Sequence, residues 1–376
     1  MKSYCIVNKR SAAWNKELKR VQRKSRRYYQ EKLFQKAGNA PKARIGKFCD
    51  LNRIEYKIIS DTEFQGMKKV KLSKEELIHL CEKSALTGRS GNGFLVSKKL
   101  EALHKRAGIL IINAVECDPG LATDSWLYRN RREWIEYGAE LLKDALCLDK
   151  IILATKESIQ KIEGIEQIKV PDRFPMGYEN YLIKHILNVE IKENELPQNK
   201  GILVMNLQTV IAIAELTQDS RAGQYQYITV ANLYTAEAKV ARVHIGDYVK
   251  AAAAGCFSEK EWENCHIYVG GGAFNCHEAV GGDKISDSTG YIAIGQMPSY
   301  EEAGRCKGCG ACTRNCPAGV EVQRLIKHVQ RNGMRDADEC ARYRALYCIG
   351  CGACTYGCVA GKDVRGVVTW AKEKLS

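Results

Sequence analysis

The chain has 376 residues, of which 45% are hydrophobic and 27% charged, a composition typical of a soluble globular protein with two or three domains. No apolar run approaches the roughly 20 residues that span a bilayer, and the first residues lack a secretory signal, so we expect a cytoplasmic protein. The net charge of +14 is uneven, because residues 1–48 carry 15 Lys and Arg against two acids (15 − 2 = +13).

The basic N-terminal arm, residues 1–48, has apolar side chains at the spacing of an amphipathic helix. They are Trp14, Leu18, Val21, Tyr28 and Leu33. Such an arm can bind nucleic acid, anionic lipid or an acidic protein, or it can remain a solvated helix without a partner. No nucleic-acid-binding motif accompanies it, so we expect no nucleic acid. We favour docking to an acidic redox partner, with a salt-dependent association rate.

A glycine-rich loop, TGRSGNGF, starts at Thr87 and precedes a helix-like stretch. Such loops bring backbone N–H groups to a phosphate, and the following helix adds its dipole. By itself the pattern is as typical of an ordinary turn.

An apolar run from Ile109 to Ile112 predicts a buried parallel strand. It leads into the polar turn NAVECDPG and then into a helix predicted from about Ser125 to Leu146. Strand, turn and helix in this order form an α/β crossover, and ligands of such sheets bind at the carboxyl ends of the strands.

Short β-branched and aromatic runs separated by glycines follow from about Tyr227 to Ile292 and predict a small mixed β domain. This region also contains Cys265, His266, Cys276 and His277. Adjacent side chains of a strand point to opposite faces, so we expect buried cysteines and ordinary histidines here rather than a metal site.

The pattern C-x₂-C-x₂-C-x₃-C occurs twice near the C-terminus, in CKGCGACTRNC and CIGCGACTYGC. Three closely spaced thiolates bind three corners of an iron–sulfur cubane, and in two-cluster ferredoxins the fourth cysteine of each run ligates the other cluster. We therefore predict two [4Fe–4S] clusters. The predicted ligands are Cys306, Cys309, Cys312 and Cys358 for one cluster, and Cys348, Cys351, Cys354 and Cys316 for the other.

Structural zinc is the alternative for these cysteines, because C-x₂-C pairs also bind tetrahedral zinc. Zinc sites use two such pairs rather than triplets with a spaced fourth thiolate. Pro317 follows the first run as in ferredoxins, whereas Val359 replaces this proline after the second run. The proline shapes a turn and binds no metal, so we still predict iron–sulfur clusters.

Taken together, these segments resemble the flavin- and NADH-binding subunit of respiratory complex I and, more closely, the C subunit (RnfC) of the Rnf ferredoxin:NAD oxidoreductase. The glycine loop, NAVECDPG, FPMGYENYLIKHI, GILVMNLQTVIAI and ARVHIGDYV occur in the order of that family, over roughly residues 80–376. The resemblance implies a Rossmann-like α/β core like that of the complex I flavin subunit (residues 49–226) and a soluble-ligand-binding β-grasp module (227–297). A helical ferredoxin domain with two [4Fe–4S] clusters (298–376) follows.

The resemblance also implies sites for FMN and NADH. The residues implied to contact FMN are Gly88, Gly91, Gly93, Asn113, Glu116, Asp118, Asn206 and Thr209. Those implied to border NADH are Phe94, which would stack on the adenine, Lys99, Gly177 and Glu179. The family has glycine, alanine and proline where this chain has Ser90, Asn92 and Leu95. Asp118 replaces a glutamate and Phe174 a tyrosine, so the match is better for FMN than for NADH.

By this resemblance, a hydride passes from NADH to FMN, and single electrons then pass through the clusters to a partner redox protein in a larger complex. FMN suits this task because it accepts two electrons together and releases them singly. The sequence leaves other functions open: a corrinoid reductase of the microcompartment type, a flavin-free iron–sulfur relay, and a flavin site that has decayed to a scaffold.

Overall fold

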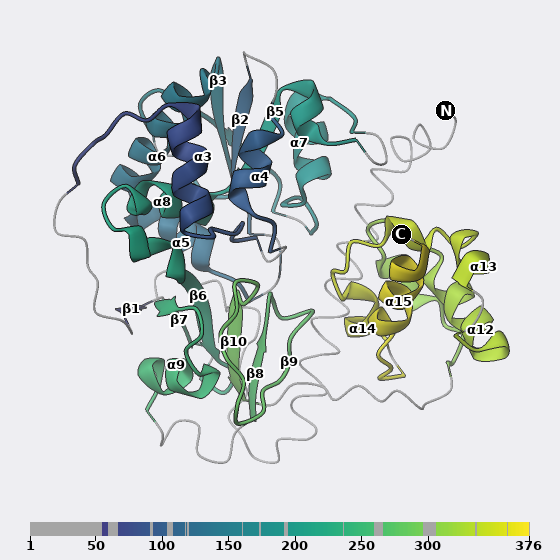
Figure 1. Cartoon of the computed structure of the whole chain (residues 1–376). Helices are drawn as coiled ribbons and strands as arrows, with labels where there is room; N and C mark the ends of the chain where they lie inside the picture. The colour runs from purple at the N-terminus through teal and green to yellow at the C-terminus, as the bar shows by residue number, and fades with distance from the viewer. Residues whose placement is uncertain are drawn as a thin grey trace. The chain divides into compact units, whose positions relative to one another are not determined.

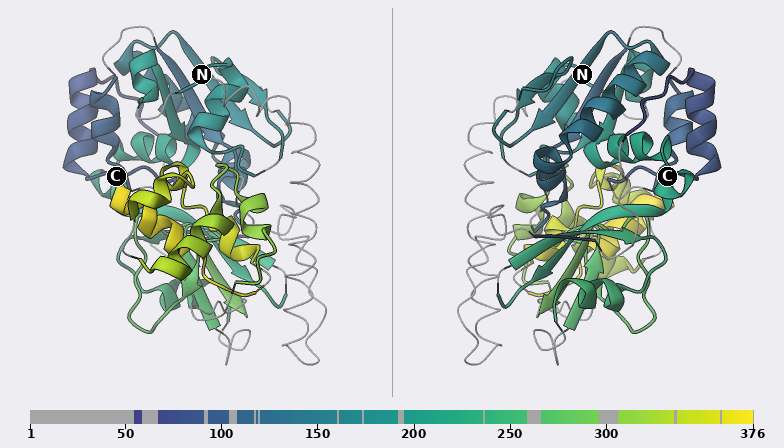
Figure 2. Two further views of the ribbon diagram at one scale, coloured as in Figure 1. Left: turned by 90° about the vertical axis from the view of Figure 1, so that its right-hand side faces the viewer. Right: turned by 90° about the vertical axis from the view of Figure 1, so that its left-hand side faces the viewer.

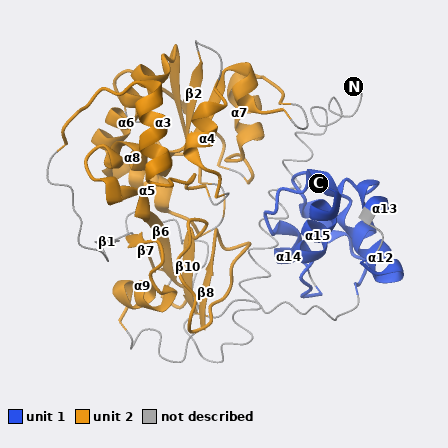
Figure 3. Cartoon of the chain, in the orientation of Figure 1, with its two compact units in different colours: residues 1–46, 296–376 blue, residues 47–295 orange. Residues whose placement is uncertain are grey.

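The computed structural model describes residues 55–58 by their backbone, and 67–90, 93–103, 108–116, 118, 120–159, 161–172, 174–191, 195–235, 237–258, 266–295, 306–334, 337–358 and 360–375. The chain divides into two compact units, residues 47–295 and residues 296–376 with 1–46 (Figure 3). The predicted basic arm lies outside the described residues. Within the described part, no helix has the length and apolar character to cross a membrane.

A four-stranded parallel sheet forms the first layer of the unit 47–295. Its strand order is β4 (Glu166–Lys169), β3 (Lys150–Thr155), β2 (Ile109–Ala114) and β5 (Ile202–Asn206). The predicted strand is β2, and the predicted crossover runs from it to β3. Because β2 is central and covered on both sides, both faces of the strand are apolar.

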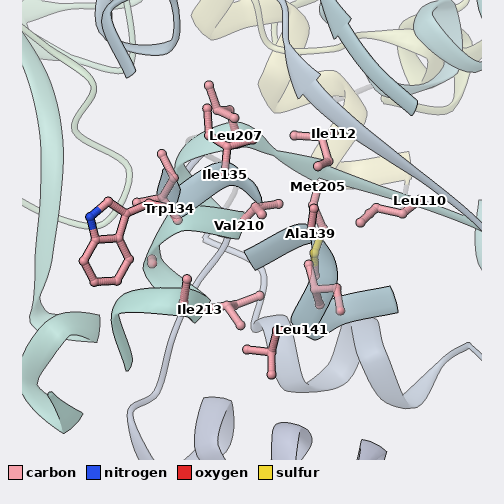
Figure 4. Packing of buried hydrophobic residues seen from close by; sticks show 14 of the residues in the cluster. Leu110, Ile112, Trp134, Ile135, Ala139, Leu141, Met205, Leu207, Val210 and Ile213 are labelled. Carbon is pink, nitrogen blue, oxygen red and sulfur yellow. The ribbon is translucent and has the colours of Figure 1, made fainter. Parts of the chain in front are cut away.

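Helices cover both faces of this sheet (Figure 1). One face packs against α3 (Lys74–Lys83), α6 (Arg132–Leu146) and α8 (Leu207–Leu216), with Leu110, Ile112 and Met205 pointing into this core (Figure 4). The other face turns alternate residues such as Ile111 and Val204 toward α7 (Glu179–Leu187). The two-residue alternation of a strand thus divides its side chains between two cores.

The helix predicted from Ser125 to Leu146 is two helices. The break lies at Arg131, between α5 (Thr123–Asn130) and α6, where φ is −124° and ψ is 34°. The Arg131 guanidinium lies 5.9 Å from the ring centroids of both Trp126 and Tyr227. The guanidinium therefore stacks on rings from a helix and from a distant strand. This is a tertiary interaction, and the local helical pattern of the sequence does not predict it.

A six-stranded mixed sheet forms the second layer of the same unit; the two views of Figure 2 show it below the first sheet. Its strands, in spatial order, are β1 (Glu55–Ile58), β7 (Glu237–His244), β6 (Tyr225–Asn232), β10 (Tyr291–Gly295), β8 (His266–Gly270) and β9 (His277–Glu278). The helix α9 (Val249–Cys256) packs on one face. The boundary predicted between residues 226 and 227 falls inside β6.

All regular elements described between residues 306 and 375 are helical. They are α11 (Ala311–Asn315), α12 (Val322–Asn332), α13 (Ala337–Ala341), η5 (Ala345–Tyr347), α14 (Ala353–Tyr356) and α15 (Arg365–Leu375). Val320, Leu325 and Val368 form a small core together with buried cysteines. The apolar positions of α12, Val322, Leu325 and Ile326, follow the three- and four-residue spacing of a helix with one buried face.

Candidate functional site

A cavity of about 460 Å³ lies beside the carboxyl ends of β2 and β5, where parallel sheets place their ligands. Ten of the twelve residues predicted to contact FMN or NADH line it: Gly88, Phe94, Lys99, Asn113, Glu116, Asp118, Gly177, Glu179, Asn206 and Thr209. Gly93 is close to the cavity without lining it, and Gly91 lies outside the described residues.

The glycine loop is closed at its base by backbone hydrogen bonds. The Gly88 N–H donates to the Phe94 carbonyl at 2.8 Å, and Thr87 forms a β-bridge with Leu95. Gly93 has a φ of 60°, the left-handed region that glycine occupies at low cost. The turn leaves the Phe94 ring 55% exposed at the edge of the cavity, an unusual position for a large apolar side chain.

Two pairs of predicted residues from distant segments contact each other. The Asn113 side chain donates to the Gly177 carbonyl oxygen at 2.7 Å. The Lys99 Nζ lies 3.2 Å from Glu179 Oε1, which joins α4 (Val96–Glu101) to the start of α7. The first contact holds the backbone at Gly177 and the second joins two side chains, on the side of the cavity that the resemblance assigns to the nucleotide.

Three carboxylates lie together at the end of β2. Glu116 accepts hydrogen bonds from the Asp124 N–H at 2.8 Å and the Ser125 N–H at 3.3 Å, both in the first turn of α5. Burial raises the pKa of Glu116, and Lys156 opposes the rise. Burial and the nearby Glu116 raise the pKa of Asp124 well above its ordinary value, and Asp124 accepts a hydrogen bond from Asn206 at 2.9 Å.

Asp118 differs from the other two carboxylates because its Oδ1 atom is buried without a hydrogen-bond partner. Burial and Glu116 raise the pKa of Asp118 to about 6. Its side chain faces the loop between β8 and β9: a Cβ placed on Gly272 would lie 3.0 Å from Asp118 Oδ2. An unpartnered carboxylate oxygen fits a ligand that donates a hydrogen bond.

The N-terminus of α8 and a buried guanidinium form another part of the cavity wall. Asn206 caps α8 by accepting from the Gln208 N–H at 2.9 Å, and Thr209 Oγ1 accepts from the Arg89 N–H at 2.9 Å. Arg89 donates from Nη2 to the carbonyl oxygens of Gly223 and Tyr225, but its Nε has no partner. Burial lowers the pKa of Arg89 to about 10. A helix N-terminus beside a buried cation fits an anionic group such as a phosphate.

Several lining residues were not predicted. Arg89 and Asp124 lie within or next to the motifs already singled out, so the sequence did carry a signal for them. The second sheet contributes Gln226 and the segment Asp287–Gly290, which no motif marked. Gln226 holds this segment by donating to the Ser286 and Thr289 carbonyl oxygens. Both sheets therefore build one cavity.

The second candidate site is formed by the eight cysteines of the repeated pattern, all of them free thiols. Backbone N–H groups point at their sulfur atoms: Gly308 N lies 3.4 Å from Cys306 Sγ, and Gly350 N lies 3.4 Å from Cys348 Sγ. Such N–H···S contacts stabilise thiolate ligands.

Most of the cysteines that affect each other electrostatically belong to the same predicted ligand set, and Cys312 of the first set also raises the pKa of Cys354 of the second. The pKa of Cys312 is raised to about 11, mainly by burial and to a smaller extent by Cys306, Cys358 and Cys309. Burial also raises the pKa of Cys354, and the next contributors are Cys351, Cys316 and Cys348. Each run is thus close to the fourth cysteine of the other run. Among the described residues, no three His, Cys, Asp or Glu side chains form a site for a single metal ion.

Comparison with known families gives two matches. Residues 81–215 match the Nuo51 FMN-binding domain, and residues 299–359 match the 4Fe-4S dicluster domain. The first segment contains β2, β5 and the cavity residues between them, and the second contains both cysteine runs.

Curated relatives are the C subunits of ion-translocating oxidoreductase complexes. The protein from Buchnera aphidicola subsp. Baizongia pistaciae is 26% identical over 269 residues, 67% of this chain and 53% of that protein. The Vibrio cholerae protein is 26% identical over 282 residues, 72% of this chain and 36% of that protein. The C subunit of the proton-translocating ferredoxin:NAD(+) oxidoreductase of Clostridium ljungdahlii is 24% identical over 71% of this chain and 61% of its own length. The chain thus spans only part of the length of these relatives.

A solved structure supports the fold. The NAD+-reducing [NiFe]-hydrogenase in its H₂-reduced state aligns with a TM-score of 0.54 and 15% identity over 81% of this chain and 63% of the other. The resemblance predicted from the sequence is confirmed by the family matches and the curated relatives. The chain is similar to the C subunits of these complexes, and it contains segments that match the Nuo51 FMN-binding domain and the 4Fe-4S dicluster domain.

Proposed function

We propose that the chain is an electron-transfer subunit that binds FMN in the cavity of its first unit and two [4Fe–4S] clusters in its second. NADH is the proposed electron donor and a redox protein the proposed acceptor, within a larger cytoplasmic or membrane-peripheral complex. The observation that carries the proposal is the cavity itself, because ten predicted contacts from four separate segments converge on it.

The polar groups of the cavity fit FMN. Three buried polar atoms of its lining lack partners in the described structure: Arg89 Nε, Asp118 Oδ1 and Gln198 Oε1. They offer one donor and two acceptors to a ligand that has both a phosphate and hydroxyl groups. The N-terminus of α8, with Asn206 and Thr209, suits the phosphate end.

The chemistry that bound FMN supplies is the conversion between two-electron and one-electron transfer. The residues of the chain position and select the ligands. Phe94 presents an exposed ring at the edge of the cavity on which an adenine can stack. The ion pair between Lys99 and Glu179 lies on the same side and gives that edge both a positive and a negative group.

Three further assignments belong to the proposal. The six-stranded sheet with α9 is proposed to be the β-grasp module, because it is small, mixed and follows the flavin-type domain. The predicted ligand sets of the two clusters are supported by the proximity of Cys312 to Cys358 and of Cys354 to Cys316. The basic arm, residues 1–48, remains predicted to dock an acidic redox partner.

Anaerobic purification followed by spectroscopy tests the proposal. We expect flavin absorption in the blue, a broad iron–sulfur shoulder and about eight iron atoms per chain. NADH should bleach both the flavin absorption and the iron–sulfur shoulder. A shoulder without flavin would support the flavin-free relay instead, and bound FMN that NADH does not reduce would exclude NADH as the donor.

Replacement of Phe94 by alanine tests the nucleotide side of the cavity. Loss of a stacking ring worth about 1 kcal/mol raises the KM for NADH roughly fivefold, with FMN and iron content unchanged. Val280→Ala is the matched control, because Val280 is 70% exposed and does not line the cavity. Equal KM values for the two variants would show that Phe94 does not contribute to NADH binding.

A further inference from the structure

The two cysteine loops of the second unit have nearly the same backbone. Gly308 and Gly310 both have φ of 70°, and Gly350 and Gly352 have φ of 68° and 77°. A glycine N–H donates to the first cysteine of each run at the same distance, 3.4 Å. The difference between the loops therefore lies in their side chains.

The two loops differ in sequence at three positions, and two of the three replace a basic residue by an apolar or aromatic one. Lys307 corresponds to Ile349, and Arg314 corresponds to Tyr356. Both basic side chains are exposed, whereas their counterparts are partly buried. The first loop thus presents basic side chains to solvent at two positions where the side chains of the second loop are partly buried.

The first loop also brings a predicted cluster ligand to the surface. Of the eight cysteines in the pattern, only Cys309 is exposed, and its counterpart Cys351 is partly buried. Electron transfer between proteins falls off steeply with distance. The cluster that Cys309 is predicted to bind is therefore the one that a partner protein can approach at this loop.

A third basic side chain lies over the same loop. Gln323 of α12 donates to the Gly308 carbonyl oxygen at 2.5 Å and holds α12 against the loop. One turn further on, Lys327 Nζ lies 3.7 Å from the position of a Cβ placed on Gly308. Among the described residues, neither Lys307 nor Lys327 forms an ion pair.

The charge of the whole segment has the same sign. Residues 306–334 contain five basic residues and one acid, Glu321. The five are Lys307, Arg314, Arg324, Lys327 and Arg331. Unpaired lysines around an exposed cofactor edge accelerate the encounter with an oppositely charged protein and align it.

We propose that Lys307, Arg314 and Lys327, which surround Cys309 and together are called the basic loop face, dock a small acidic one-electron carrier protein. The proposal rests on the proposed function, because it requires clusters in the second unit. It assigns electron exchange with the partner protein to the cluster of the first loop.

Binding of a small acidic [4Fe–4S] ferredoxin to the full, cluster-loaded chain tests this proposal. Association rates are measured by anaerobic biolayer interferometry at several salt concentrations. The double variant Lys307→Glu with Lys327→Glu should slow association at least tenfold at low salt and flatten its salt dependence. Arg314 is kept, because it donates to the Cys309 carbonyl oxygen at 2.8 Å and supports the loop.

The matched control is Arg342→Glu with Lys374→Glu, which makes the same charge change at exposed positions of other segments of the unit. It should slow association less than twofold. Equally slow association of both double variants would show that net charge alone causes the effect, and would overturn the proposal. Loss of binding only when residues 1–48 are removed would assign docking to the basic arm instead.

Iron content separates failure of the proposal from failure of the proposed function. A parent chain without about eight iron atoms contradicts the proposed function itself. Parent and variants with full iron but equal association rates contradict only the docking face. If the glutamate variants lose iron, Lys307→Gln with Lys327→Gln repeats the test with half the charge change, and normal rates in that variant overturn the proposal.

Discussion

Replacing Gly138 by alanine tests whether the crossing of α6 and α8 holds the α8 N-terminus at the cavity. A Cβ on Gly138 would lie 2.6 Å from the Val210 carbonyl oxygen and 2.9 Å from its Cγ1. Ordinary contacts of a Cβ begin at 3.4 Å, so the helices must separate by about 0.8 Å (3.4 − 2.6). The carbonyl oxygen belongs to the backbone and cannot rotate away.

The two energetic consequences of the alanine oppose each other. Overpacking costs about 1–3 kcal/mol, whereas alanine favours a helix over glycine by about 1 kcal/mol. We expect a net loss of about 1 kcal/mol, which lowers the melting temperature of a unit of this size by about 2–4 °C. Movement of Val210 also displaces Thr209 and its hydrogen bond from Arg89, so FMN should bind roughly tenfold more weakly.

Thermal unfolding of the flavin-free chain and fluorescence titration with FMN measure the two effects. Gly281→Ala is the control, because a Cβ there meets no atom within 4 Å and Gly281 has no positive φ. The same melting temperature and FMN affinity in both variants would show that the helix crossing does not position the cavity wall.

Three further outcomes are expected. Since burial raises the pKa of folded Asp118 from 3.8 to about 6, the free energy of unfolding of the flavin-free chain should fall as pH rises from about 4 to about 6. Asp118→Asn should remove this contribution, on the order of 2 kcal/mol, in urea titrations across that range. Arg242→Met should destabilise the chain by about 3–5 kcal/mol, because it leaves buried Glu215 without its ion pair, and adding Glu215→Gln should restore much of the loss. Cys309→Ser should reduce iron to about four atoms per chain, whereas Cys340→Ser, which changes a buried cysteine outside the repeated pattern, should leave it unchanged in iron assays.

The parts of the site that the sequence predicts are those built from one continuous segment. Each cysteine run bends around its own glycines, so the spacing alone is enough to predict the ligands. The strand Ile109–Ala114 and the turn after it are equally local, and their residues line the cavity as expected.

The parts that the sequence does not predict depend on contacts between distant segments. The segment Asp287–Gly290 reaches the cavity only because β10 pairs with β6 and Gln226 holds the loop before it. At the break between the two helices, Arg131 lies against Tyr227, about a hundred residues away in sequence. No local pattern encodes these contacts, because the partner side chains carry no motif of their own.

The pairing of β1 with β7 has a consequence for shortened forms of this protein. Residues 55–58 lie parallel to residues 239–242 and occupy what would otherwise be the outer edge of the six-stranded sheet. A fragment that begins after residue 58 would keep every cavity residue but expose the unpaired N–H and C=O groups of β7. Open edges of this kind recruit strands from other molecules, so such a fragment should self-associate even where its flavin pocket is intact.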